Sequence, residues 1–337
     1  MRWEGRYQEF GLCHDMLATP EVVRGFDCQR MADTADAIKE TGRLLMTGEG
    51  SSRIFPAKSV MAYALSRQIP VSLHTEAGRQ AQEYDLEDWA VFALSNSGRT
   101  AEVIGLFQKL TQENHPNRYS LTAFSDSKLE SLATKGYVLE CGKESAVAAT
   151  KSVLEQALFY RALIEHIQGT VSLQDRLETL ADQMEQALTA EIDSHLIERI
   201  ASAPIIYWAG RNNGVAEELT LKTNEITRKP SDFLEGTYAV HGIEEVMNPE
   251  DVVIWVDPYS DSESKFTEVL GNGVGMEVIA IADRETSLPT IRIPDAGDLS
   301  PFVKMCAGWN ILVEVGLRLG IDLDKPQRAR KVGNEFS

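Results

Sequence analysis

A hydroxyl-rich turn lies between a strand-length apolar run and a helical pattern, and it is the stretch best suited to chemistry. The apolar run at 91–94 ends at 95–100 (SNSGRT), and apolar residues at helical spacing follow at 103, 104 and 107. Such a turn gathers hydroxyl groups and the free backbone N–H groups of a helix's first turn around one point, where an anion is stabilised. The turn therefore predicts a phosphate site, although serine and threonine also cap many helices without binding a ligand.

A second serine-containing turn favours the anion site over simple capping. Residues 44–46 form a short strand pattern, 47–53 (TGEGSSR) form the turn, and a helical pattern runs through Tyr63 and Leu65. Further strands are expected at 71–74, 118–124 and 138–141, each joined by a connection that permits a right-handed crossover. The segment 142–151 then leads into a helix.

The strand–turn–helix pattern begins again near residue 204. Residues 205–214 mirror 44–52, and 252–262 mirror 91–97, both displaced by about 162 positions, which indicates an internal duplication. The second copy carries Asp257, Asp261 and Glu263 where the first has its hydroxyl-rich turn, so only the first copy should bind phosphate. We therefore predict an α/β fold of two tandem, doubly wound, parallel-sheet units of flavodoxin-like type.

Five regions are expected along the chain. They are a helical N-terminal segment at 1–33, an anion-binding unit at 34–170, a helical connector at 171–200, a second unit at 201–324 and a C-terminal tail at 325–337.

Composition limits the partners. The 337 residues carry 33 basic and 51 acidic side chains, and the net charge of −18 argues against partners that are nucleic acids or anionic membranes. The four cysteines lie far apart without metal-ligand spacing, and no signal peptide or membrane-length apolar run is found. We expect a cytoplasmic protein without metal or cofactor, whose cysteines are buried or incidental thiols.

The second unit adds residues that could move protons. Glu218, Lys222 and Glu225 share one face of a helix that should end near Pro230, although such a group is more often a salt-bridged surface. His241 lies in a loop between two glycines, and Lys331 lies in a short basic tail. Taken singly, neither residue indicates a function.

Together these motifs resemble the tandem SIS (sugar isomerase) proteins. The resemblance rests on 50–52 (GSS), 95–100, 144–151, 218–225, His241 with Gly242, and 324–331, and the sixteen-residue gap from Glu225 to His241 agrees with the family spacing. The family includes the isomerase half of glucosamine-6-phosphate synthase, the SIS-type glucosamine-6-phosphate deaminases and the fructosamine-6-phosphate deglycases.

The resemblance implies roles for particular residues. Glu225 would move a proton between C1 and C2, Lys222 would assist it, His241 would open the sugar ring, and Lys331 would form a Schiff base with the open-chain ketose. The histidine of the family reaches the neighbouring subunit's site, which implies a homodimer with shared active sites. The substrate and its phosphate would be held by Gly50, Ser51, Ser52, Ser95, Asn96, Ser97, Thr100, Val147 and Ala149.

Elementary chemistry agrees with these roles. A proton α to a carbonyl is removed quickly only by a positioned base, and a lysine is nucleophilic only when neutral, so Lys331 would need burial beside a cation such as Arg328 or Arg330.

Departures from the family pattern limit which of the family's activities we expect. We expect that no glutaminase domain precedes the first unit. Arg99 replaces an acidic residue of the synthase, Ala149 replaces a serine, and Ile243 stands where proline is usual. We predict an amino-sugar-6-phosphate isomerase that releases ammonia. The alternatives are a fructosamine-6-phosphate deglycase, an isomerase of a sugar with another C6 anion such as a sulfonate, and a non-catalytic sugar-phosphate regulator. The joint presence of Glu225, His241 and Lys331 argues against the regulator.

Overall fold

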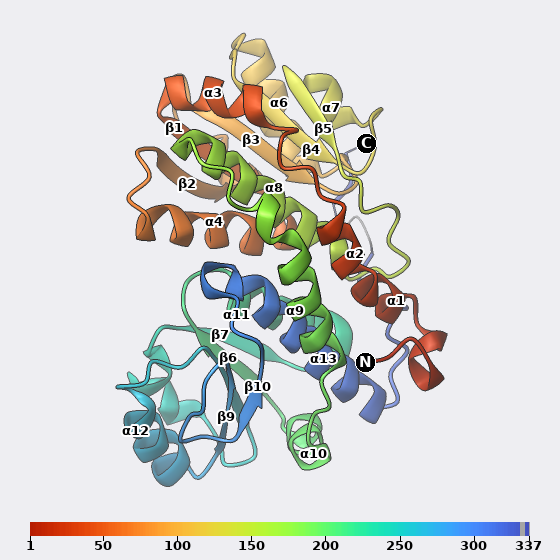
Figure 1. Cartoon of the computed structure of the whole chain (residues 1–337), viewed down its shortest axis with the longest axis vertical. Coiled ribbons are helices and arrows are strands. Elements are labelled where there is room, and N and C mark those ends of the chain that lie inside the picture. Colours follow the sequence, from red (N-terminus) through yellow and green to blue (C-terminus); the bar gives the residue numbers. More distant parts are fainter. Residues whose placement is uncertain (331–333, 337) are drawn as a thin grey trace. The chain divides into compact units, whose positions relative to one another are not determined.

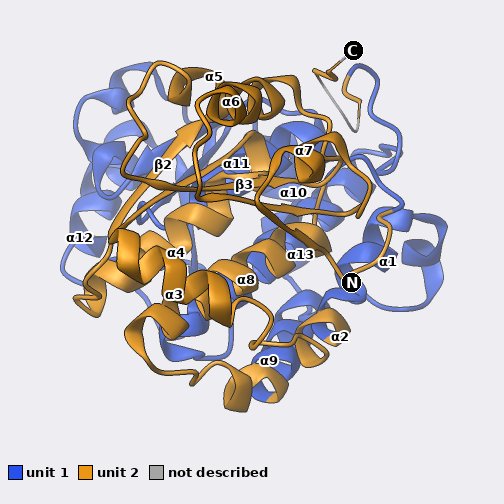
Figure 2. Ribbon diagram, turned by 90° about the horizontal axis from the view of Figure 1, so that it is seen from above, with its two compact units in different colours: residues 1–20, 145–148, 179–328 blue, residues 21–144, 149–178, 329–337 orange. Residues whose placement is uncertain are grey.

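The computed structural model describes residues 1–330 and 334–336, which divide into two compact units (Figures 1 and 2). We call them the N-terminal unit (21–144, 149–178 and 329–337, orange in Figure 2) and the C-terminal unit (1–20, 145–148 and 179–328, blue in Figure 2). Each unit is built on one sheet. The predicted Lys331 lies outside the described residues.

The N-terminal unit contains a parallel five-stranded sheet in the order β2-β1-β3-β4-β5. Its central strand, β3, is largely a continuous apolar run, as expected for a strand covered on both faces, and every residue of β3 is buried. The strands are β1 (Arg43–Gly48), β2 (Ser72–Ala77), β3 (Ala90–Ser95), β4 (Arg118–Thr122) and β5 (Lys135–Val138). The helices are α3 (Ala32–Thr41), α4 (Ile54–Ser66), α5 (Gly78–Ala81), α6 (Ala101–Gln112), α7 (Lys128–Leu132) and α8 (Lys151–Gln168).

The fifth strand ends where the sequence pattern placed its start, so the expected strand at 138–141 is wrong. The reason is a buried carboxylate on α8. Glu155 accepts hydrogen bonds from the backbone N–H of Glu140 at 2.8 Å and of Cys141 at 2.8 Å, which removes both groups from the strand ladder.

The C-terminal unit contains a second parallel five-stranded sheet, in the order β10-β9-β8-β6-β7. Its strands are β6 (Ile206–Gly210), β7 (Ser231–Glu235), β8 (Val252–Val256), β9 (Glu277–Ala282) and β10 (Thr290–Arg292). When the strands are counted along the chain within each sheet, both sheets have the order 2-1-3-4-5 of flavodoxin-like folds. The predicted α/β architecture with two parallel sheets is confirmed.

The registers of the two sheets also correspond. Thr47 lies opposite Ala93 in the first sheet, and Ala209 lies opposite Trp255 in the second. These are the positions that the displacement of about 162 residues relates.

The helices of the C-terminal unit begin with α1 (Gly11–Leu17) and continue with α10 (Ser194–Ser202), α11 (Val215–Lys222), α12 (Glu263–Phe266) and α13 (Ser300–Arg318). Two helices run across a unit boundary, α2 (Thr19–Arg24) and α9 (Leu177–Thr189). The connector is therefore two helices, because the chain breaks after α9 and Asp193 caps α10 by accepting a hydrogen bond from the His195 N–H at 2.8 Å.

The four cysteines are free and buried, as expected. Within residues 1–330 and 334–336, none of the helices combines the length and the apolar character that a membrane crossing requires.

Candidate functional site

The two serine-containing turns of the N-terminal unit follow neighbouring parallel strands. Gly50–Ser52 forms a 3₁₀ turn (η2) between β1 and α4, and residues 96–100 join β3 to α6. Strand order reverses between β1 and β3, and ligands of open α/β sheets bind at the carboxyl ends of the strands at such a point. The fold thus brings both predicted anion-binding turns to one edge of the sheet.

Internal hydrogen bonds preform the second turn. The hydroxyls of Ser95 and Thr100 are 2.9 Å apart, and the Gly98 N–H donates to Ser95 Oγ at 3.1 Å. Ser97 Oγ accepts from the Arg99 N–H at 3.1 Å, which leaves the Ser97 O–H able to donate to an anion. Gly98 has φ +62°, and a Cβ there would lie 2.3 Å from the Cβ of Ser127, so no larger residue fits.

The C-terminal residues 334–336 pair with this turn. The Ala101 N–H donates to the Asn334 carbonyl at 3.0 Å, and the Phe336 N–H donates to the Arg99 carbonyl at 2.9 Å. The Arg99 guanidinium also bonds the Glu335 carboxylate at 2.9 Å. The expectation that the first-turn N–H groups of α6 are free is therefore wrong at Ala101.

Asn96 is held by a buried carboxylate that the sequence analysis did not assign. Its amide donates to Glu144 at 3.0 Å and to the Ser152 hydroxyl at 3.0 Å. Glu144 in turn accepts from the Thr150 N–H at 2.7 Å and the Ser152 hydroxyl at 2.9 Å. Glu144 therefore fixes the amide of Asn96 and the start of α8 together.

Gln156 is a second residue that the sequence analysis missed. It is buried on α8, its amide nitrogen lies 3.5 Å from Ser52 Oγ, and its Oε1 has no hydrogen-bond partner among the described residues. Its place between the apolar residues 153–154 and 157–160 was the signal that could have revealed it. The other two predicted substrate residues, Val147 and Ala149, are half-buried and alternate with the buried Ala146 and Ala148.

The predicted proton-transfer residues lie at the end of α11 in the C-terminal unit. Lys222 Nζ donates to Glu225 Oε2 at 2.7 Å and lies 3.4 Å from Glu218 Oε1. The side chains of Glu218 and Lys222 are buried, whereas that of Glu225 is 28% exposed. The simple interpretation of a salt-bridged surface is wrong, because two of the three charges lie inside the protein.

The local backbone explains this arrangement. α11 continues into a π-helical turn (η4, Thr223–Thr227), which ends at Arg228 with φ +59°, shortly before Pro230. Such wide turns are frequent at functional sites. This arrangement places the accessible carboxylate of Glu225 beside the buried ammonium group of Lys222.

His241 lies on a different segment from Glu218, Lys222 and Glu225. It is exposed, lies between two 3₁₀ turns, η5 (Tyr238–Val240) and η6 (Ile243–Val246), and its Nε2 is 3.3 Å from Thr237 Oγ1. Within the described residues, no hydrogen bond or ion pair joins it to Lys222 or Glu225.

At the corresponding edge of the second sheet, a carboxylate forms ion pairs with two basic side chains. Asp257, which follows β8, pairs with Arg211 at 2.7 Å and with the buried Lys304 at 2.7 Å. A carboxylate thus lies where the first sheet presents Ser95.

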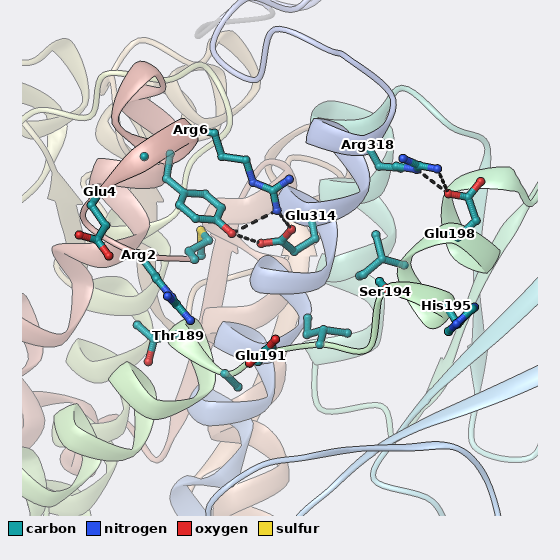
Figure 3. Close-up of a pocket in the computed structure, with 16 residues that line it drawn as sticks. Arg2, Glu4, Arg6, Thr189, Glu191, Ser194, His195, Glu198, Glu314 and Arg318 are labelled. Carbon is teal, nitrogen blue, oxygen red and sulfur yellow. Dashed lines mark hydrogen bonds and ion pairs between the residues drawn. The ribbon is translucent and has the colours of Figure 1, made fainter.

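A cavity of about 1040 Å³ in the C-terminal unit contains none of the predicted site residues (Figure 3). Several of its charges are paired, since Arg6 and Tyr7 bond Glu314, and Arg318 pairs with Glu198. In the part of the chain that the structure describes, no group of three or more His, Cys, Asp or Glu side chains is placed to hold a metal ion.

Comparisons with known proteins show what the sequence and the fold are similar to. Residues 37–166 match the family model described as SIS domain. The predicted relationship to the SIS phosphosugar proteins is confirmed.

One curated relative is an aminotransferase. The chain is 26% identical over 288 residues to a glutamine–fructose-6-phosphate aminotransferase (isomerizing) of Halobacterium salinarum, covering 78% of this chain and 47% of the relative. The chain thus spans about half the length of that curated relative.

Two solved structures show the same fold. Tagatose-6-phosphate ketose/aldose isomerase of Escherichia coli superposes with a TM-score of 0.76 at 16% identity, covering 97% of this chain and 99% of the other. Glucosamine-6-phosphate deaminase of Thermotoga maritima superposes with a TM-score of 0.75 at 18% identity, covering 96% and 99%.

Proposed function

We propose that this chain is an aldose/ketose isomerase of the SIS class that moves a proton between C1 and C2 of an open-chain 6-phosphosugar. The single observation that carries the proposal is the Lys222–Glu225 pair, in which a buried ammonium holds a partly exposed carboxylate at 2.7 Å. The relatives described as isomerising and deaminating enzymes support the same reaction class.

The proposed substrate is an amino sugar. Glu225 takes the proton from C2 of the open-chain aldose and returns it to C1, through an enamine. The imine that forms at C2 then adds water and releases ammonia, which leaves the ketose phosphate. His241 is proposed to assist ring opening and Lys331 to bind the ketose as a Schiff base.

The phosphate is proposed to bind at the carboxyl edge of the first sheet. Hydroxyl donors from 51–52 and 95–100 suit a dianion there, and the charge-assisted bonds they can form are stronger than neutral ones. The second unit, proposed to be a duplicate of the first by its matching strand order and register, has Asp257 at the corresponding edge.

A substrate panel tests the proposal. Glucosamine, galactosamine and fructosamine 6-phosphates are incubated with the protein, and ammonia, free amino acid and ketose are measured together. Ammonia with ketose from an aminohexose phosphate supports the proposed deaminating isomerase. Amino acid release from a fructosamine 6-phosphate whose nitrogen belongs to an amino acid would establish the deglycase instead. Binding without turnover of any sugar would overturn the enzymatic proposal in favour of a regulator.

A further inference from the structure

Helix α1, which precedes the SIS-matched residues, is anchored to Asp324, the residue just before the C-terminal tail. Asp324 Oδ2 accepts a hydrogen bond from the Gly11 N–H at 2.7 Å, and its Oδ1 accepts one from the Leu12 N–H at 2.8 Å. One carboxylate thus satisfies two of the N–H groups that the beginning of a helix leaves without intrahelical partners.

One turn further along α1, Asp15 makes a similar pair of bonds to another segment. Its Oδ2 accepts from the Ser145 N–H at 2.6 Å and from the Ala146 N–H at 3.2 Å, and its residue surface is only 3% exposed. Hydrogen bonds from backbone N–H groups to an ionised carboxylate are about twice as strong as neutral ones. Asp15 therefore fixes the backbone at 145–146 firmly.

Packing reinforces this attachment. A Cβ added to Gly11 would lie 2.5 Å from the Cβ of Ser145, so α1 approaches the segment as closely as a glycine allows. Residues 145–148 accordingly belong to the C-terminal unit, although the residues on both sides of them belong to the N-terminal unit.

The attached segment presents two of the proposed substrate residues. Ala146 and Ala148 are buried, whereas Val147 and Ala149 are half-exposed. A shift of one residue would exchange the buried and exposed sets. The bonds from Asp15 to consecutive N–H groups set the register that leaves Val147 and Ala149 available to a ligand.

We infer that Asp15 is a positioning residue for the substrate-binding segment 145–149. The inference rests on the proposed function, because Val147 and Ala149 are substrate contacts only in that proposal. Asp15 itself need not touch the sugar.

The test compares four variants of the full chain. Asp15→Ala removes both bonds, Asp15→Asn keeps an oxygen acceptor, and Gly11→Ala separates α1 from Ser145 without removing any hydrogen-bonding group. Asp193→Ala is the matched control, since it removes a carboxylate that caps α10 in the same unit. Amide hydrogen exchange of the peptide covering 142–150 and the Kd for glucosamine 6-phosphate are measured for each.

Asp15→Ala and Gly11→Ala should speed exchange in this peptide by about tenfold and leave exchange in β1 and β3 unchanged. Both should raise KM and Kd for glucosamine 6-phosphate by about tenfold while kcat changes by less than about threefold, as expected for lost uniform binding. Asp15→Asn should stay within about threefold of the wild type because its carbonyl oxygen can accept, and Asp193→Ala should change neither readout.

Unchanged exchange at 142–150 in a folded Asp15→Ala protein would overturn the inference. So would faster exchange with an unchanged Kd, since the segment would then be anchored without serving the ligand. Failure of the wild type itself to bind or convert any phosphosugar would instead overturn the proposed function.

Discussion

Lys222 and Glu225 form a hydrogen-bonded ion pair at 2.7 Å in which the ammonium is 1% exposed and the carboxylate is 28% exposed. The positive charge is enclosed by protein and the negative charge is partly open to solvent. A substrate can therefore reach the carboxylate while the lysine compensates its charge from within, which suits a base that gains and loses a proton in each turnover.

Glu225→Gln should abolish isomerisation without disturbing the fold or ligand binding. The amide keeps the shape of the side chain but cannot accept the proton from carbon. Incubation with substrate in heavy water, followed by mass spectrometry of the sugar, should show no deuterium at C1 or C2. Normal incorporation of deuterium by the variant would exclude Glu225 as the base.

Lys222→Met should destabilise the protein by about 3–5 kcal/mol, because it withdraws the positive charge from two carboxylates of which Glu218 is fully buried. Urea unfolding measures the effect. The matched control is Lys265→Met, which breaks an exposed pair with Glu268 at the same i,i+3 spacing and should cost less than about 1 kcal/mol. Equal losses of stability in the two variants would show that burial of the Lys222 ammonium does not increase the contribution of its ion pairs to the free energy of unfolding.

Helical spacing in the sequence correctly placed these charges on one face, but it could not show that the face points inward. Spacing reports which side chains are neighbours, whereas burial depends on what packs against the helix. The sequence revealed the two serine-containing turns because a strand, its turn and the next helix are contiguous in the chain. The pairing of Arg99 with Glu335 joins residues far apart in the chain and left no local signal.

Ser97→Ala combined with Thr100→Ala should raise KM for a 6-phosphosugar far more than it lowers kcat. Each lost hydrogen bond to a dianion should cost roughly 1.5–3 kcal/mol. The control is Ser260→Ala with Ser262→Ala at the corresponding turn of the second sheet, which should leave KM unchanged. If KM responds equally to both double variants, or to neither, the hydroxyls of 95–100 serve only to shape the turn.

Glu49→Gln should make stability less dependent on pH. Burial raises the pKa of the Glu49 carboxyl, opposed by the hydrogen bond it accepts from the Gly78 N–H at 2.9 Å. Because the folded pKa lies above the unfolded one, stability is lost as pH rises through the folded value. Glutamine can accept the same bond without a charge.

The two proteins should therefore be equally stable below about pH 4, near the ordinary pKa of glutamate, and the variant should be the more stable at pH 7. Urea unfolding at both pH values measures the difference. A variant less stable than the wild type at pH 7 would show that the ionised form of Glu49 is favoured in the folded protein.

His241 lies on a loop between η5 and η6, whereas Lys222 and Glu225 lie on α11 and η4. His241 is exposed on a loop that also carries Tyr238, 49% exposed, and Val246, 63% exposed. We propose an obligate homodimer in which His241 of one subunit serves the site that contains Glu225 of the other.

Glu225→Gln and His241→Ala proteins, each inactive alone, should regain activity when they are unfolded together and refolded. Random pairing makes about half of the dimers mixed, and one of the two sites in each mixed dimer then has both wild-type residues under closed two-fold symmetry. Activity should therefore approach roughly a quarter of the wild-type value. If native mass spectrometry shows mixed dimers and the sample stays inactive, His241 and Glu225 act within one chain or His241 has no catalytic role.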